Sequence, residues 1–268
     1  MIISTEEIMK KSVSLILTAV FLILLCSCSA EQNNPSSSAS VLPKGRGLKI
    51  TAFGDSIAAG YGLESQDDNY LTLFSKNIGA VLTNDAVSGY DSDDLVSLIS
   101  SGKADGDIKN ADIIILSIGG NDILHNSDEI ISVIKQAALH GGEYFPESIN
   151  GIYLNFEKNL TAVFTHIQSV NPNASVIIQT LYNPALKQGY KISVIDASKL
   201  IDKYIVRLNE SIFSVSGQFE SVTVFDVADE MNKDADNFYN LKDNFDIHPT
   251  KNGHLTLSEL YTKYYNNY

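Results

Sequence analysis

The chain has 268 residues, 44 % of them hydrophobic, and a formal net charge of −13. This length permits one large domain with a sizeable core, and the apolar content excludes disorder for most of the chain. The negative charge is spread without a basic patch, which argues against nucleic acid and anionic lipid as partners. Arg46 and Arg207 are the two arginines in the sequence, so guanidinium clamps on phosphates are not expected and an uncharged substrate centre fits better.

The N-terminal residues have the pattern of a targeting segment. Two lysines precede an apolar run at 13–25, which is too short to span a bilayer comfortably but has the length of a signal-peptide core. The run ends in Leu25–Cys28, which resembles a bacterial lipobox. We therefore predict a lipoprotein signal peptide and lipobox over 1–28, with Cys28 as the lipidated residue. A plain secretory signal remains the alternative, and both cysteines of the chain fall in this segment, which leaves the mature domain without a thiol.

From Ser29 to about Leu42 the composition shifts to Ser, Asn, Gln, Ala and Pro, which bury too little apolar surface to fold. This predicts a flexible tether over 29–45 and a folded domain over 46–268. Lipid on Cys28 would hold that domain on the outer face of a membrane without a transmembrane helix. We expect an extracytoplasmic, lipid-anchored monomer, secreted if the lipobox is not used.

The stretch Lys49–Ala58 predicts a buried strand that delivers a serine to its end. Residues 50–53 are mainly β-branched or aromatic, and Gly54 breaks the strand. The residues that follow favour a helix, so Ser56 would lie at a helix N-terminus, where free backbone N–H groups can receive developing negative charge. A nucleophilic serine needs this setting, although an ordinary capped strand-to-helix turn also explains the tripeptide on its own.

Two further strands are predicted at 81–87 and 112–118. The first delivers Gly89 to its carboxyl end, and the second delivers Asn121 after a pair of glycines. An asparagine in such a place can present an amide donor to a reacting centre. A turn glycine and a helix-capping asparagine are the plainer interpretations, and these residues alone leave both open.

The remaining elements alternate between helix and strand. Helices are predicted at 70–80, 91–101, 123–139, 152–170 and 192–213, and strands at 174–181 and 222–226. Because parallel strands require crossover connections, this order predicts an α/β fold with a five-stranded parallel sheet between helical layers and no second domain. Tyr182, Asn183 and Pro184 follow the fourth strand and are expected to line a cleft.

The acidic run at 226–244 lacks the ligand spacing of a calcium loop, so it predicts a solvated surface. We expect no metal and no cofactor. The run is followed by the block DIHP at 246–249 and a terminal helix, which places His248 on a loop near the end of the sheet.

Four short blocks of the chain occur in the order found in one enzyme family. They are FGDS at 53–56, SG at 88–89, GGND at 119–122 and DIHP at 246–249. Over about residues 48–265 the chain resembles the SGNH, or GDSL-type, hydrolases. The resemblance implies a three-layer α/β/α sandwich of flavodoxin-like topology.

The resemblance also implies roles for particular residues. Ser56 would attack an ester carbonyl while His248 accepts its proton. The backbone N–H groups of Ser56 and Gly89 and the side-chain amide of Asn121 would form the oxyanion hole. The family's usual last block has an aspartate three residues before the histidine, where this chain has Phe245.

We therefore assign Asp246 to orient His248, and Asp243 or a backbone carbonyl remains an alternative. The other histidines, His140, His166 and His254, are expected on the surface or in packing, whereas His125 is expected near the mouth of the cleft. Asp55 and Asp122 match family positions and are expected to brace loops.

The sequence therefore predicts a serine esterase that hydrolyses carboxylic esters through an acyl-enzyme. The ester would be lysophospholipid-like, short-acyl or an O-acetyl group on a glycan. Three alternatives remain: an O-acetyl esterase or acyltransferase of carbohydrate or cell wall, a glycosidase with paired carboxylates, and a non-catalytic surface-binding lipoprotein with a vestigial site.

Overall fold

The computed structural model describes residues 42–140, 147–184, 191–192, 195–233, 238–240 and 246–267. The predicted signal peptide and most of the predicted tether lie outside these residues, so both stay predictions. None of the helices in the described part is long and apolar enough to cross a membrane.

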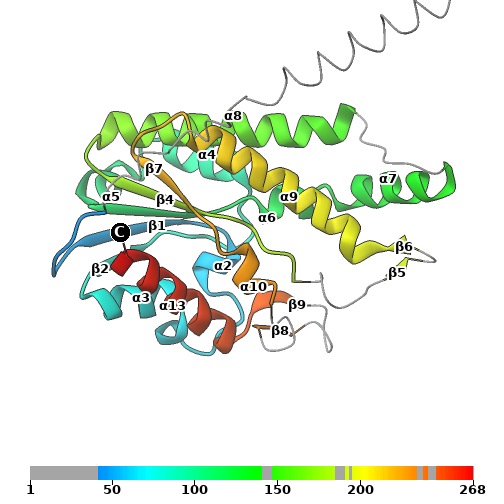
Figure 1. The fold of residues 1–268 in the computed structure, drawn as a ribbon. Helices are drawn as coiled ribbons and strands as arrows, with labels where there is room; N and C mark the ends of the chain where they lie inside the picture. The colour runs from blue at the N-terminus through cyan, green and yellow to red at the C-terminus, as the bar shows by residue number, and fades with distance from the viewer. Residues whose placement is uncertain are drawn as a thin grey trace, which may run out of the picture. The chain divides into compact units, whose positions relative to one another are not determined.

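The centre of the domain is a five-stranded parallel sheet, which confirms the predicted fold class. Its strands are β1 (Lys49–Gly54), β2 (Val81–Asn84), β3 (Ile113–Ser117), β4 (Ser175–Gln179) and β7 (Val222–Phe225). They lie in the order β2-β1-β3-β4-β7 (Figure 1). In a sheet of this order the strand order reverses between β1 and β3, and ligands bind in the crevice at the carboxyl ends of these strands.

Strand β3 lies between β1 and β4 and is buried along its whole length. Its side chains alternate between the two faces of the sheet, as in any strand. Ile114 and Leu116 belong to the apolar core on one face, and Ile113 and Ile115 belong to the core on the other face. The unbroken apolar sequence of this strand is therefore explained by helices that cover both faces.

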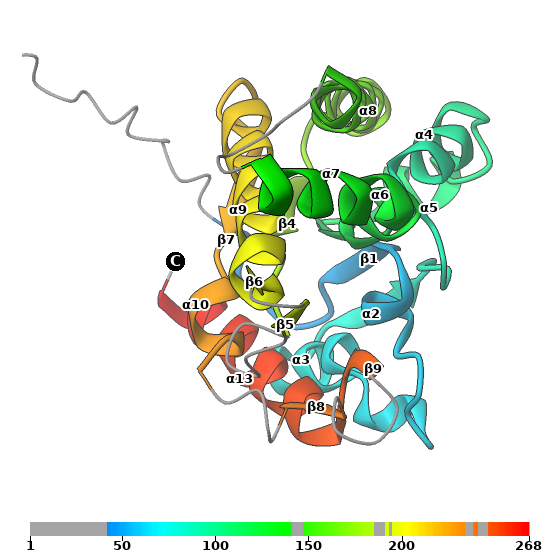
Figure 2. The same ribbon diagram turned by 90° about the vertical axis from the view of Figure 1, so that its right-hand side faces the viewer.

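Helices cover both faces of the sheet (Figures 1 and 2). One face carries α4 (Ser92–Ser100), α5 (Asp105–Asn110), α8 (Glu147–Val170) and α9 (Ala197–Ser216), and the other carries α3 (Tyr70–Ile78), α10 (Ala228–Met231) and α13 (Lys251–Asn267). Helix α8 buries Phe156, Leu160, Val163 and Ile167, which recur at helical spacing and form its apolar stripe. The result is the three-layer α/β/α sandwich.

The shorter elements are α2 (Ser56–Ala59), η1 (Gln66–Asp68), α6 (Gly120–Leu124) and α7 (Ser127–His140), with two hairpins, β5 (Lys191–Ile192) with β6 (Ile195–Asp196) and β8 (Tyr239–Asn240) with β9 (Asp246–Pro249). The single helix predicted at 123–139 is divided into α6 and α7. The amide of Asn126 donates to the carbonyl oxygen of Asp122 at 2.8 Å, which competes with the regular helical bonding of that carbonyl.

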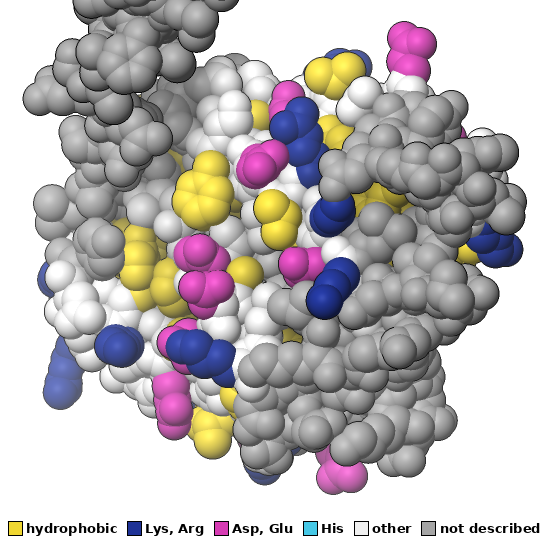
Figure 3. Space-filling view, turned by 45° about the vertical axis from the view of Figure 1, so that its right-hand side comes forward, with side chains coloured by type: hydrophobic (Ala, Val, Ile, Leu, Met, Phe, Trp, Pro, Cys, Tyr) yellow, Lys and Arg dark blue, Asp and Glu magenta, His cyan; other side chains and the backbone are white. Residues whose placement is uncertain are grey.

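Charged side chains of both signs are interspersed on the described part of the face drawn in Figure 3, with small groups of apolar side chains between them. This face therefore carries no concentrated basic patch within the described residues.

Candidate active site

The turn between β1 and α2 fixes the position of Ser56. Gly54 has φ +159°, and a Cβ atom there would lie 2.3 Å from the backbone oxygen of Ser117, so the two strand ends approach more closely than any side chain permits. Asp55 caps α2 by accepting a hydrogen bond from the backbone N–H of Ile57 at 2.9 Å. Ser56 is the first residue of the helix, so its own backbone N–H has no partner within the helix.

His248 lies against Ser56 at the carboxyl edge of the sheet. Its Nε2 atom is 2.9 Å from Oγ of Ser56. Its Nδ1 atom is 2.5 Å from Oδ1 of Asp246, which also accepts the backbone N–H of His248 at 3.0 Å. Each ring nitrogen therefore has one partner: Nε2 is placed to receive the serine proton while Nδ1–H donates to the carboxylate. Asp243 and Phe245 lie outside the described residues.

The ring of Tyr61 lies against the imidazole of His248. The two ring centroids are 4.5 Å apart, and the planes are tilted by 44°. Tyr61 is 55 % exposed, so it forms part of the rim of the site. The sequence contains no signal for this contact, because Tyr61 lies in the polar loop after α2.

Asn121 follows β3 by way of a glycine with a positive φ. Gly119 has φ +120°, and a Cβ atom there would lie 3.0 Å from the ring of Phe156. The side chain of Asn121 is largely buried, and its amide donates to the backbone oxygen of Tyr90 at 2.8 Å. An amide nitrogen carries two hydrogens, so one more donor remains for a ligand.

The segment that carries Gly89 runs alongside the end of β1. Strand β2 ends at Asn84, earlier than the predicted boundary, but the backbone N–H of Val87 still donates to the carbonyl of Gly54 at 3.0 Å. Gly89 is exposed and has φ +88°, a left-handed conformation that favours glycine. The candidate oxyanion-hole donors thus come from loops after β1, β2 and β3.

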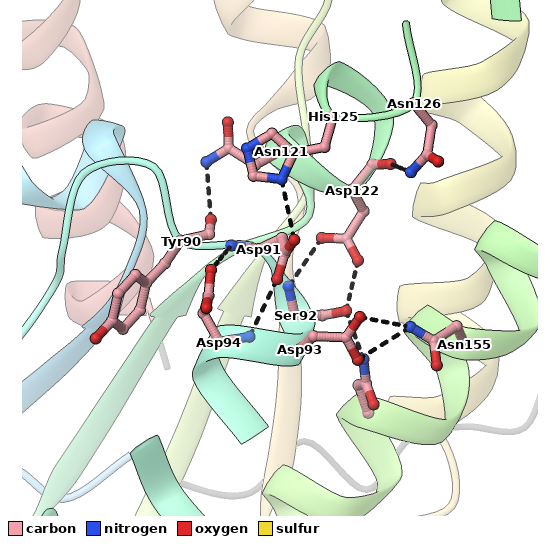
Figure 4. A network of polar contacts seen from close by, with 11 residues as sticks. Tyr90, Asp91, Ser92, Asp93, Asp94, Asn121, Asp122, His125, Asn126 and Asn155 are labelled. Atoms are coloured by element: carbon pink, nitrogen blue, oxygen red, sulfur yellow. Dashed lines mark hydrogen bonds and ion pairs between the residues drawn. The ribbon is translucent and has the colours of Figure 1, made fainter. Parts of the chain in front are cut away.

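Helix α6 and the residue after it hold three consecutive residues of this segment (Figure 4). The contacts are Asn121 Nδ2 to Tyr90 O (2.8 Å), His125 Nδ1 to Asp91 Oδ2 (3.0 Å), and Ser92 Oγ and N to the two carboxylate oxygens of Asp122 (2.5 and 3.0 Å). We call this set of contacts the α6 clasp. It ties the loop after β2 to the loop after β3, the two segments that carry Gly89 and Asn121.

The α6 clasp is anchored on α8. The amide of Asn159 donates to Oγ of Ser92 at 2.9 Å and to Asp93 at 2.8 Å, and Asn155 donates to the same Asp93 carboxylate. The prediction that Asp122 braces a loop agrees with these contacts. The sequence did not predict Ser92 and Asn159 as part of the site. Each is a polar residue in a predicted helix, and no sequence pattern shows that its side chain is buried.

Two buried carboxyl groups support the site without contacting the imidazole. Burial raises the pKa of Asp55 to about 7, and the nearby charge of Asp122 adds to the rise. Burial likewise raises the pKa of Asp122 to about 6, although the two hydrogen bonds from Ser92 oppose it. Both groups therefore keep a proton at a pH where an exposed carboxyl has lost it.

An apolar cavity of about 160 Å³ lies beside Ser56 and His248. Ile57 and Ile247, the sequence neighbours of Ser56 and His248, form part of its wall. Tyr182, Asn183 and Pro184 also line it, as expected from the sequence.

The remaining histidines have separate surroundings. His254 is fully buried, accepts the backbone N–H of Tyr70 at 3.3 Å, and has its pKa lowered to about 4 by burial. Nε2 of His166, on α8, lies 2.8 Å from Oδ1 of Asp105, on α5. Within the described ranges no group of three or more His, Cys, Asp or Glu side chains is arranged to hold a metal ion. The side chain of His140 lies outside what the structure describes.

Comparisons with known proteins identify a family and a shared fold. A family model, the GDSL-like Lipase/Acylhydrolase family, matches residues 52–255. The uncharacterized protein YpmR of Bacillus subtilis (strain 168) is 24 % identical over 178 residues, which cover 64 % of this chain and 66 % of that protein.

Solved structures with the same fold are more distant in sequence. The lipase Lip_vut3 from a goat rumen metagenome has a TM-score of 0.61 at 21 % identity, covering 80 % of this chain and 95 % of its own. Phospholipase A1 from Streptomyces albidoflavus has a TM-score of 0.58 at 18 % identity, covering 82 % and 99 %. A catalytic mutant of Axe2, an acetylxylan esterase from Geobacillus stearothermophilus, has a TM-score of 0.57 at 15 % identity, covering 82 % and 95 %.

The family match spans well over half of the chain and includes all four sequence blocks. The last block, DIHP at 246–249, contributes the histidine beside Ser56. The chain therefore belongs to the GDSL-like lipase/acylhydrolase family of ester-hydrolysing enzymes.

Proposed function

We propose that this protein hydrolyses carboxylic esters through a covalent acyl-enzyme on Ser56. The observation that carries the proposal is the 2.9 Å contact between Oγ of Ser56 and Nε2 of His248, with Asp246 on the other ring nitrogen. Oγ forms a bond to the ester carbonyl carbon while its proton passes to Nε2. The carbon–oxygen bond to the alcohol then breaks, and the same proton goes to the leaving alcohol.

Water completes the cycle by the same route. It attacks the acyl carbon, gives its proton to Nε2, and the bond to Ser56 breaks as Oγ recovers that proton. The negative charge on the carbonyl oxygen in both steps would be bound by the backbone N–H groups of Ser56 and Gly89 and the amide of Asn121. The α6 clasp ties together the two loops that carry the last two donors.

The substrate class follows from the site's charge and walls. An uncharged ester suits a site whose described residues bring no arginine near Ser56, and an apolar cavity beside the nucleophile suits an acyl chain. Both a lipid-like ester and a short-acyl or O-acetyl ester of a glycan remain within the proposal. A phospholipase and an acetylxylan esterase share the fold.

The test is hydrolysis of p-nitrophenyl esters by the full-length chain and by its Ser56→Ala variant, together with labelling by a fluorophosphonate. We expect hydrolysis and labelling by the wild type and neither by the variant. Activity that survives Ser56→Ala would support the paired-carboxylate alternative, and a wild type silent on every ester and on the probe would support a binding protein with a vestigial site.

We also propose that Cys28 anchors the domain to the outer face of a membrane. The sequence Leu25–Cys28 and the polar stretch after it support this location. Replacement Cys28→Ala should abolish labelling by a fatty-acid probe and release the protein into the medium, whereas Cys26→Ala should do neither. Fatty-acid labelling that persists in Cys28→Ala would contradict the anchor.

A further inference from the structure

The cavity beside Ser56 is bounded by elements from several parts of the chain. Its walls include parts of α2, α6, α9, β9 and the segment after β4. The aliphatic members are Ile57, Ile123, Leu124, Leu181, Ile201, Ile205 and Ile247. Ser56 itself does not line the cavity, but both of its sequence neighbours do. A chain attached to the acyl carbon at Ser56 therefore has this cavity directly beside it.

The polar residues at the base of the cavity already have partners. The amide of Gln179 donates to Oγ of Ser117 at 2.9 Å and accepts at its oxygen from the hydroxyl of Tyr261 at 2.9 Å. Thr180 donates to Asp226 at 2.8 Å. Asp55 and Asn183 also hydrogen-bond within the protein, whereas the buried hydroxyl of Tyr182 has no hydrogen-bond partner among the described residues. Most of the wall that meets a ligand is therefore apolar, and it favours a saturated hydrocarbon over a sugar or a charged headgroup.

We infer that this cavity binds the acyl chain of the ester and that Ile201 and Ile205 on α9 limit the chain's length. The inference rests on the proposed function and specifies its substrate. A cavity of about 150 Å³ lined by aliphatic side chains holds a molecule the size of benzene, so this one has room for about six carbon atoms. The preferred substrates are esters of straight-chain acids of medium length.

Helix α9 contributes two isoleucines, Ile201 and Ile205, to the cavity wall. In Figure 2, α2 and β9 lie together on one side and the start of α9 lies on the other. Ile201 and Ile205 are one helical turn apart, so their side chains share one face of α9, and both line the cavity. The next residue, Val206, does not line this cavity and is 48 % exposed.

The test compares kcat/KM for p-nitrophenyl acetate, butyrate, hexanoate, octanoate and laurate, using the full-length chain. For the wild type we expect an increase of about fourfold per methylene up to hexanoate, the ratio that corresponds to about 0.8 kcal/mol per buried CH₂, and no further increase beyond octanoate. Ile205→Phe fills the far end, so it should lower hexanoate and octanoate hydrolysis at least tenfold and leave acetate within about threefold.

Ile205→Ala should move the optimum to a longer chain, and Val206→Phe, which adds a ring to the same helix outside the cavity, should reproduce the wild-type profile. Retained acetate hydrolysis shows that each variant is folded. A wild-type optimum at acetate or at laurate, or an Ile205→Phe profile identical to that of Val206→Phe, would overturn the inference while leaving the esterase intact. A wild type that hydrolyses no ester would instead overturn the proposed function and this inference with it.

Discussion

Nε2 of His248 lies 2.9 Å from Oγ of Ser56, although 192 positions separate the two residues in the sequence. Ser56 is placed by the end of β1, whereas His248 lies on β9, outside the main sheet. The distance between them therefore depends on how β9 packs against the elements around it. Gly253, in the first turn of α13, packs closely against these elements: a Cβ atom there would lie 2.8 Å from the backbone oxygen of Phe238 and 2.8 Å from Cβ of Pro249.

Gly253→Ala should separate Ser56 from His248. The added methyl group must push the β8–β9 hairpin away from α13, which we expect to destabilise the fold by about 1–3 kcal/mol and to lower kcat by about 10²-fold, since a misplacement of 1 Å has that effect. Gly151→Ala is the matched control, because that glycine lies in α8 with nothing within 4 Å of the added atom. It should leave kcat unchanged and stabilise the protein slightly. Equal kcat values for the two variants would show that β9 is not positioned by this contact.

Asp246→Asn should lower kcat by about 10³–10⁴-fold with little change in KM. An amide in place of the carboxylate favours the wrong imidazole tautomer and cannot stabilise the imidazolium that forms in the transition state. Asp229→Asn, which changes an exposed carboxylate on α10, is the control and should behave as the wild type. A loss of less than tenfold for Asp246→Asn would return the orienting role to Asp243 or to a backbone carbonyl.

Asn121→Ala should lower kcat by about 10²–10³-fold, the usual cost of losing one oxyanion donor. The carbonyl of Tyr90 also loses its partner, so the free energy of unfolding should fall by about 1–2 kcal/mol. Asn126→Ala is the control. It removes a side-chain amide of the same kind, whose hydrogen bond goes to the nearby carbonyl oxygen of Asp122 in α6. If both variants lost the same amount of stability and both kept the kcat of the wild type, Asn121 would have a structural role alone.

The α6 clasp can be tested with a double-mutant cycle on Ser92→Ala and Asp122→Asn. Each variant should lower kcat, with little change in KM, because each loosens the link between the loops that carry Gly89 and Asn121. The two residues are in direct contact, so their effects on the free energy of unfolding should fail to add by about 0.5–3 kcal/mol. Strict additivity in both stability and kcat would show that the contact does not hold the loops together.

The sequence was sufficient for those parts of the site that depend on local pattern. The apolar run of β3 and the strand, glycine and serine of residues 50–56 predict a hydroxyl at the edge of a parallel sheet, because burial and turn chemistry act over a few residues. The contact between the rings of Tyr61 and His248 joins segments far apart in the chain, and so does the cavity wall that α9 contributes to. Such contacts depend on how whole elements pack, and no short pattern encodes that.

Asp55 should make the stability of the protein depend on pH in a direction unlike that of an ordinary acid. Its pKa is about 7 in the folded protein and 3.8 without burial, so between these values the unfolded chain loses a proton that the folded protein keeps. Ionisation of the unfolded chain then lowers the free energy of unfolding as pH rises from about 4 to 7, by up to ~1.4 kcal/mol per unit of pKa difference. Above pH 7 the loss is complete.

Asp55→Asn keeps a residue that caps helices well and removes this proton. Urea unfolding of both proteins should therefore give a difference in free energy that is constant below about pH 4 and then grows in favour of the variant up to about pH 7. The lowered pKa of His254 acts in the opposite direction, because its stabilising effect is lost as pH falls from 6.5 toward 4. Since His254 is present in both proteins, its contribution cancels in the difference. A difference that stays constant from pH 4 to 7 would mean that the carboxyl of Asp55 ionises as readily in the folded protein as in the unfolded chain.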